Sequence, residues 1–205
     1  MAFDIRYDII LFSLNSFCQS YLSDKKYNEL VSDLTEELSR KISSTGLRLD
    51  DFDLVKKIGT GSFSHVFYAR LKAKNHFVAL KCISKASIKC EGDIDMIVAE
   101  KMALKKTIES PYIVQLLSSF QSETYIFLVM EFLAGGNLHF HMIRSKNECF
   151  AVDQVCFYSA QVALALDFIH RQGIIYRDLK LSNIVLTPHG YIKLVDFGMY
   201  VNISF

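Results

Sequence analysis

The polar residues best placed to do chemistry lie close together in the C-terminal part of the sequence. Two carboxylates, Asp178 and Asp196, flank a short apolar hairpin whose arms are residues 184–186 and 191–195. Four residues separate Asp178 from Asn183, so one loop can carry a base and an amide ligand towards the same point. The hairpin then returns the chain so that Asp196 can approach that point. Phosphoryl transfer needs such a set, because one carboxylate orients and deprotonates a hydroxyl while other oxygen ligands hold Mg²⁺ on the phosphates.

These residues stand in two motifs that resemble a known family. The segment that starts at Tyr176 reads Tyr-Arg-Asp-Leu-Lys-Leu-Ser-Asn and resembles the catalytic loop of eukaryotic protein kinases. The triplet Asp-Phe-Gly that starts at Asp196 resembles their magnesium-binding motif. Tyr176 in place of the more usual His, and Met199 after the triplet, resemble the AGC group, which contains protein kinase C, Akt and the G-protein-coupled receptor kinases.

The resemblance implies a role for each polar residue of the two motifs. Asp178 is expected to be the catalytic base, and Lys180, which fits the serine/threonine pattern, to steady the γ-phosphate of ATP. Asn183 joins them as a catalytic residue, and Asn183 and Asp196 are expected to hold Mg²⁺. Arg177 would pair with a phosphorylated activation loop.

A glycine-containing segment lies upstream, between two predicted strands. Gly59 and Gly61 lack Cβ atoms, so backbone N–H groups can approach phosphate oxygens closely. The kinase loop has a third glycine where this chain has Ser64, which should stiffen the loop without abolishing nucleotide binding. The residues expected to bind the nucleotide here are Ile58, Gly59, Thr60, Gly61, Ser62, Phe63, Ser64, His65 and Val66.

A lysine follows the glycine-containing segment at the spacing that the family pattern requires. Lys81 ends the sequence Val-Ala-Leu-Lys in a predicted strand, and a lysine that points inward there needs a partner, because an unpaired buried ammonium is costly. The candidate partner is Glu100, in a helix predicted over residues 95–104. By resemblance, Lys81 holds the α- and β-phosphates and Glu100 orients Lys81. The alternative for Glu100 is a solvent-exposed helix residue.

Two further strands are predicted at residues 113–117 and 125–130, and residues 131–136 resemble the hinge that joins the two kinase lobes. Backbone groups of Glu131 and Leu133 would hydrogen-bond the adenine edge. The apolar walls of the adenine site are expected to be Ile58, Val66, Ala79, Met130 and Val185.

Two neutral residues bear on the choice of protein substrate. Relatives commonly place acidic residues where this chain has Asn137 and Ser182, and those carboxylates receive substrate guanidinium groups as charge-assisted pairs. The neutral side chains predict a weaker preference for arginine-rich substrates.

Composition sets broader limits. The 205 residues are 51% hydrophobic and 22% charged with a net charge of +1, which is typical of a globular chain of one domain or slightly more. Balanced charge indicates neither nucleic acid nor an anionic membrane surface as a partner. The five cysteines contain no Cys-x-x-Cys pair and favour free thiols in a reducing cytosol or nucleus. The longest apolar runs, 9–12 and 125–130, are too short to span a bilayer, so no membrane span is expected.

Residues 1–50 are predicted to be an N-terminal helical extension, and residues 51–205 a kinase domain. Apolar residues recur at helical spacing between Tyr27 and Ile42, which indicates an amphipathic helix that must dock on something. It would either brace the catalytic domain or, paired with residues 9–17, form a dimerising element.

A long helix is predicted from Asp153 to Arg171, and it is apolar on two opposite sides. Such a helix is buried, and each side needs a partner. One stripe contains Val155, Tyr158, Val162, Leu166 and Ile169, and the other contains Phe157, Ala160, Leu164 and Phe168.

Together these patterns predict an α+β, two-lobed, protein-kinase-like fold: an antiparallel sheet with one helix, then part of a helical lobe. The implied function is ATP- and Mg²⁺-dependent phosphorylation of serine or threonine on protein substrates in signalling. The chain diverges from the family after Met199, so the activation loop and lower helical lobe are expected to be missing. Two alternatives stay open: a non-catalytic, nucleotide-binding regulatory module, and a fragment without a stable fold that acts through its N-terminal helices.

Overall fold

The computed structural model describes residues 46–61, 63–198 and, for the backbone only, 201–202. The predicted N-terminal helices, and with them the bracing or dimerising role, lie outside the described residues. The boundary predicted between residues 50 and 51 therefore stays a prediction.

The N-terminal lobe is a five-stranded antiparallel sheet in the order β1-β2-β3-β5-β4. Its strands are β1 Phe52–Thr60, β2 Ser64–Leu71, β3 His76–Ser84, β4 Leu116–Gln121 and β5 Tyr125–Glu131. Alternate residues of β3 face opposite sides of the sheet. Leu80 packs in a cluster with the stacked rings of Phe52, Phe120 and Phe127, whereas Ala79 belongs to the cluster shared with the helices. The same alternation places Lys81 on the helix side.

The helix of this lobe, α3, runs over Glu91–Lys106 and so starts four residues before the predicted range of 95–104. Its start is set by Asp93, whose Oδ2 accepts hydrogen bonds from the backbone N–H of Lys89 at 2.7 Å and of Cys90 at 3.2 Å. A carboxylate that satisfies free N–H groups at a helix start also interacts favourably with the helix dipole. The predicted range begins after Asp93 and therefore did not include this cap.

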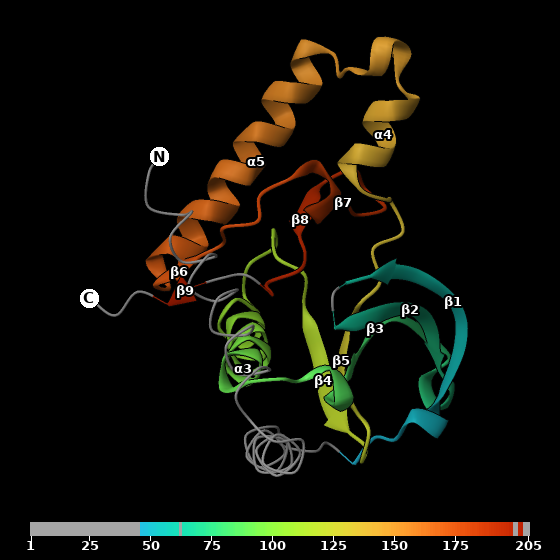
Figure 1. Cartoon of the computed structure of the whole chain (residues 1–205). Coiled ribbons are helices and arrows are strands. Elements are labelled where there is room, and N and C mark those ends of the chain that lie inside the picture. Colours follow the sequence, from blue (N-terminus) through green and yellow to red (C-terminus); the bar gives the residue numbers. More distant parts are fainter. Residues whose placement is uncertain (1–45, 62, 199–200, 203–205) are drawn as a thin grey trace.

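The second lobe contains two helices and short paired strands, which lie together on the far side of the hinge from the sheet (Figure 1). These elements are α4 Leu138–Arg144, α5 Val152–Arg171, β6 Ile174–Ile175, β7 Ile184–Leu186, β8 Ile192–Leu194 and β9 Val201–Asn202. Short 3₁₀ helices occur at Leu49–Asp51, Lys72–Lys74, Lys85–Ser87, Lys146–Glu148 and Leu181–Asn183. β7 pairs with β8 and β6 with β9, both antiparallel. The two-lobed α+β fold is confirmed for the described part of the chain.

One predicted strand is only partly correct. Of residues 113–117, only the last two belong to β4, because the preceding segment pairs with β8 of the other lobe instead. Val114 N–H donates to the Leu194 carbonyl at 3.0 Å, and Leu194 N–H donates to the Tyr112 carbonyl at 2.8 Å. This segment therefore joins the lobes before the chain reaches β4.

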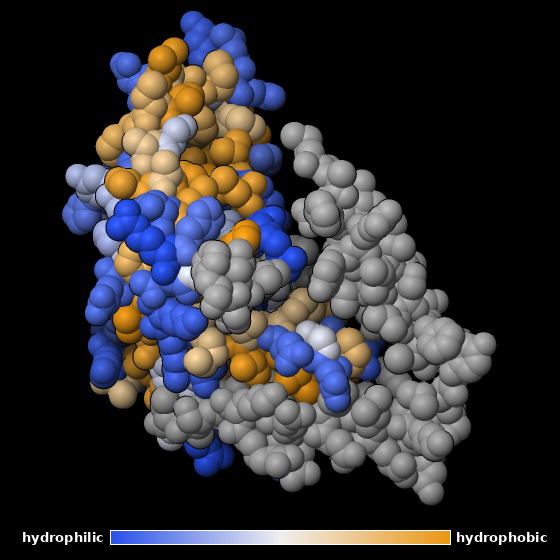
Figure 2. All heavy atoms as spheres, turned by 90° about the vertical axis from the view of Figure 1, so that its left-hand side faces the viewer, coloured by the Kyte–Doolittle hydropathy of each residue, from blue (hydrophilic) through white to orange (hydrophobic). Residues whose placement is uncertain are grey.

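Neither predicted apolar stripe of α5 is buried along its whole length. Of the first stripe, Ile169 is fully buried and Tyr158, Val162 and Leu166 pack partly against the core, whereas Val155 is 47% exposed. Ala165, which belongs to neither stripe, is also fully buried, and Phe168 of the second stripe packs partly against the core. Phe157 and Leu164 of the second stripe remain 48% and 52% exposed. Figure 2, which faces the α5 side of the molecule, shows apolar side chains gathered over this lobe.

By length and composition alone α5 could cross a membrane. Core helices of globular proteins pass the same test, and α5 packs against the core through Ala165 and Ile169. The helix is therefore weak evidence for a membrane span.

The two sides of α5 should respond differently to truncation. Ile169→Ala should lower the free energy of unfolding by about 2–5 kcal/mol, because it opens a cavity in the core. Leu164→Ala should cost less than about 1 kcal/mol, since half of this side chain already faces solvent. Urea denaturation of both variants checks this. An equal loss for both would mean that the exposed stripe is covered in solution.

Candidate active site

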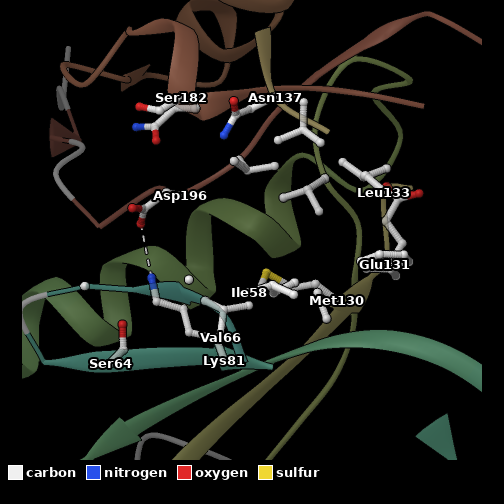
Figure 3. Close-up of a pocket in the computed structure, with 18 of the residues that line it drawn as sticks. Ile58, Ser64, Val66, Lys81, Met130, Glu131, Leu133, Asn137, Ser182 and Asp196 are labelled. Carbon is white, nitrogen blue, oxygen red and sulfur yellow. Dashed lines mark hydrogen bonds and ion pairs between the residues drawn. The ribbon is translucent and has the colours of Figure 1, made fainter. Parts of the chain in front are cut away.

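A cavity of about 280 Å³ lies between the sheet and the β7–β8 hairpin (Figure 3). Its lining residues are Ile58, Gly59, Thr60, Gly61, Ser64, Val66, Ala79, Lys81, Glu100, Val114, Met130, Glu131, Phe132, Leu133, Asn137, Ser182, Asn183, Val185, Val195 and Asp196. A second cavity of about 410 Å³ adjoins it on the side of α3 and the catalytic loop, and Asp178 and Lys180 line that one. The apolar end lies at the hinge and the charged end at the catalytic loop, as a nucleotide with a phosphate tail requires.

An ion-pair network joins the two lobes at the charged end of the cavity. Lys81 Nζ lies 2.6 Å from Glu100 Oε1 of α3 and 3.1 Å from Asp196 Oδ1 beyond β8. Burial would lower the pKa of the Lys81 ammonium, but the two carboxylates outweigh it and raise that pKa above its usual value. Burial would likewise raise the pKa of the Asp196 carboxyl, but Lys81 outweighs it and lowers that pKa. The predicted pair of Lys81 with Glu100 is therefore confirmed, and Glu100 is not a solvent-exposed helix residue; the contact of Lys81 with Asp196 was not predicted.

The catalytic loop holds its carboxylate through two neighbours. Asp178 Oδ2 accepts hydrogen bonds from Asn183 Nδ2 at 2.8 Å and from Lys180 Nζ at 2.7 Å. Asn183 Nδ2 also donates to the Asp178 carbonyl at 3.0 Å. The amide nitrogen of Asn183 is thus engaged, which leaves its Oδ1 as the atom that can bind a cation.

Two non-glycine residues of the motifs have a left-handed backbone. Arg177 has φ of 59° and Asp196 has φ of 61°. A non-glycine residue in this conformation carries a conformational strain of about 1–3 kcal/mol, and such residues tend to occur at functional sites. The surrounding structure holds them in part through Tyr176, whose hydroxyl donates to the Val195 carbonyl. The Tyr176 ring also packs edge-on against the Phe197 ring, with 5.1 Å between the ring centroids. Burial raises the pKa of Tyr176 strongly, so its hydroxyl stays a neutral donor between the two motifs.

The hinge is fixed to the second lobe by side-chain and backbone contacts. The Glu131 carboxylate accepts hydrogen bonds from the backbone N–H of Gln115 at 2.8 Å and from Lys193 of β8. Gly135 N–H donates to the Leu186 carbonyl at 3.0 Å, and a Cβ on Gly135 would lie 2.5 Å from that oxygen. Only glycine permits this approach. The Glu131 N–H donates to the Gln115 carbonyl at 3.1 Å, so this backbone donor is engaged within the protein.

The structure brings most of the predicted nucleotide-binding residues to this cavity. Ser62 lies outside the described residues, and Phe63 lines the second cavity only. His65 lines neither cavity: it alternates with Ser64 and Val66 along β2 and faces the other side, where it contacts Phe67 edge-on. Sequence reasoning missed three apolar wall residues, Val114, Phe132 and Val195. Only their place in the fold identifies them, since apolar residues of this kind occur throughout the chain.

The residues at the charged end fit a bound Mg²⁺. Asn183 Oδ1 and the Asp196 carboxylate offer oxygen ligands, which Mg²⁺ prefers. Lys81, Glu100 and Asp196 together carry one excess negative charge, which a cation would offset. Within the described ranges no cluster of three or more His, Cys, Asp or Glu side chains could hold a metal without further ligands. The site therefore suits a cation that also binds phosphate oxygens.

A sheet with one helix, a hinge, and a charged catalytic loop beneath a glycine-containing hairpin define a protein kinase domain. The family model for the protein kinase domain matches residues 52–204, so the chain belongs to the protein kinase family. Two relatives are protein kinase C zeta type from Oryctolagus cuniculus and protein kinase C delta type from Mus musculus. Each is 42% identical to the chain over 156 residues, which is 76% of this chain.

The chain spans about a quarter of the length of these two relatives, 26% and 23% respectively. The match supports the predicted place of the chain among AGC-like eukaryotic protein kinases.

The ion-pair network makes a pH-dependent contribution to stability that can be measured. Lys81→Met should cost about 3–5 kcal/mol at pH 7, because it leaves the Glu100 carboxylate buried and unpaired. Wild-type Asp196, whose pKa is lowered, keeps its stabilising charge until the pH falls below the usual value of 3.8. In the variant only the Gly198 N–H and Lys180 still oppose the effect of burial, so the Asp196 pKa rises above its wild-type value and the variant loses less stability than the wild type as the pH falls. The cost should therefore be smaller at pH 4 than at pH 7.

Chemical denaturation at both pH values checks this prediction. Lys72→Met is the matched control, because Lys72 forms an exposed ion pair with Asp53 at 3.6 Å. This substitution should lower the free energy of unfolding by less than about 1 kcal/mol at either pH. A cost for Lys81→Met that equals the control, or that does not change with pH, would contradict the assigned network.

Proposed function

We propose that this chain transfers the γ-phosphate of ATP to serine or threonine hydroxyls of protein substrates. The observation that carries the proposal is the meeting of Lys81, Glu100 and Asp196 from three separate elements, within a cavity that continues to Asp178. Catalysis of phosphoryl transfer is mostly positioning and electrostatic stabilisation, and these residues supply both.

Each residue has a step to perform. The hinge carbonyl of Glu131 and the backbone of Leu133 position adenine, and the Lys81 ammonium, held by Glu100, neutralises phosphate charge. Asp178 accepts the proton of the attacking hydroxyl, and Lys180 beside it stabilises negative charge on the transferred group. Mg²⁺, when bound at Asn183 and Asp196, would shield the charge of the phosphates.

The non-catalytic alternative gains no support from the described residues, because the carboxylate, amide and lysine at the catalytic positions are all present and paired with one another.

The described cysteines, Cys82, Cys90, Cys149 and Cys156, are free thiols, which supports a reducing compartment, the cytosol or the nucleus.

Binding and transfer should be separable by substitution. Mg-ATP should raise the melting temperature of the wild type in proportion to the logarithm of its concentration above Kd, and Lys81→Met should lose that shift. Asp178→Asn should keep the shift but lower phosphate transfer to a peptide by about 10²–10⁴-fold, because the base is removed.

The matched control is Asp167→Asn, which removes an exposed carboxylate paired with Arg171 on α5. It should leave both readouts unchanged. A wild type that binds Mg-ATP but transfers nothing to any serine or threonine peptide would contradict the proposed activity.

The neutral residues near the cavity predict weak selection for arginine. The Asn137 side chain accepts the Phe140 N–H at 2.8 Å and caps α4, a role that Asp performs equally well. Asn137→Asp combined with Ser182→Glu should therefore preserve the fold and add two carboxylates at the cavity. Each charge-assisted pair is worth about 1.5–3 kcal/mol, so kcat/KM for arginine-rich peptides should rise about tenfold or more over alanine analogues.

A peptide array compares the wild type, the double variant and Gln172→Glu, which adds charge at an exposed residue outside both cavities. Strong arginine selection by the wild type, or equal gain by the control, would count against this prediction.

A further inference from the structure

Ser64 is the first residue of β2 and stands where the kinase loop has its third glycine. It pairs with Ile83 across the sheet, and the next pair on the same face is Val66 with Lys81. Strand residues two apart share a face, so Ser64 lies on the cavity side together with Val66 and Lys81. Figure 3 shows the Ser64 oxygen turned towards the cavity.

On the proposed function, a phosphate tail held at Lys81 would continue towards Ser64. Ile83, the strand partner of Ser64, follows Lys81 by two residues, which is about 6.6 Å along β3. This direction leads away from the hinge and towards the tip of the loop. Ser64 also lines both cavities, so it lies where the nucleotide cavity opens towards the catalytic loop. The residues that line both are Thr60, Gly61, Ser64, Lys81, Glu100 and Asp196.

The hydroxyl is available to a ligand. The Ser64 backbone carbonyl accepts the Gly61 N–H at 2.8 Å and closes the loop. Within the described residues the Ser64 Oγ makes no hydrogen bond. A Cβ on Gly61 would lie 3.0 Å from this Oγ. Glycine at position 61 therefore keeps the space in front of the hydroxyl open.

We propose that the Ser64 hydroxyl donates a hydrogen bond to an oxygen of the terminal phosphates of the nucleotide. A loop with glycine at this position has no such side-chain donor. The inference rests on the proposed function and deepens it, since it makes Ser64 a residue that selects nucleotides by the length of their phosphate tail. A hydrogen bond to a charged phosphate is stronger than one between neutral groups, so its loss is measurable.

Isothermal titration calorimetry of the 205-residue chain with Mg-ATP, Mg-ADP and adenosine tests this. Ser64→Ala should weaken Mg-ATP binding about tenfold or more and leave adenosine binding within about twofold. Ser64→Thr keeps the hydroxyl and should bind Mg-ATP within about threefold of the wild type. The control is His65→Ala, on the opposite face of the same strand, which should change neither ligand.

Equal Mg-ATP affinity of the alanine, threonine and wild-type proteins would overturn the role of Ser64. Equal losses for Mg-ATP and adenosine in Ser64→Ala would also overturn it, because they would reflect the loop's shape and not its hydroxyl. A wild type that binds adenosine no more weakly than Mg-ATP would overturn the phosphate site of the proposed function itself, and this inference with it.

Discussion

The contact between Lys81 and Glu100 is the interaction on which the rest of the site depends. Their side chains are only 10% and 5% exposed, and removing two charges from water costs several kcal/mol for each ion. Such a pair persists only if both partners are held in place by the surrounding structure. β3 and α3 supply that support, and Asp196 attaches the same ammonium to the second lobe. The Lys81 ammonium thus determines how β3, α3 and the segment after β8 are oriented around the proposed phosphate position.

Around this network the protein uses backbone geometry where side chains cannot reach. Left-handed residues turn the chain at Arg177, where the catalytic loop begins, and at Asp196, just after the hairpin, and the Tyr176 hydroxyl connects those two turns. Strain at such positions is retained when neighbouring contacts over-determine the conformation. Asp178 and Asp196, the proposed base and cation ligand, therefore lie on a segment with few alternative arrangements.

The sequence was informative where chemistry restricts the residue type, and less so where packing decides. Lys81 and Glu100 could be predicted to meet, because an unpaired buried charge is costly, whereas the contact of Lys81 with Asp196 was not predicted. The orientation of His65 follows from strand register, which a loop sequence does not define. The wall residue Val114 owes its position to a non-local hydrogen bond with Leu194, and no local pattern encodes such pairing.

The contacts of the hinge restrict how the two lobes can move. The Glu131 carboxylate reaches Lys193 of β8, and the backbone of residues 112–114 is hydrogen-bonded to Leu194 of the same strand. These two contacts between the lobes both reach β8, close to the ion pair of Lys81 with Asp196, so a rotation that opens the cleft would have its axis near this strand. Points near an axis move little, and Asp196 follows β8 by two residues. In the proposed function, such an opening would break the ion pair of Lys81 with Asp196 and lift the glycine-containing hairpin away from Asp196, which would give the nucleotide product an exit.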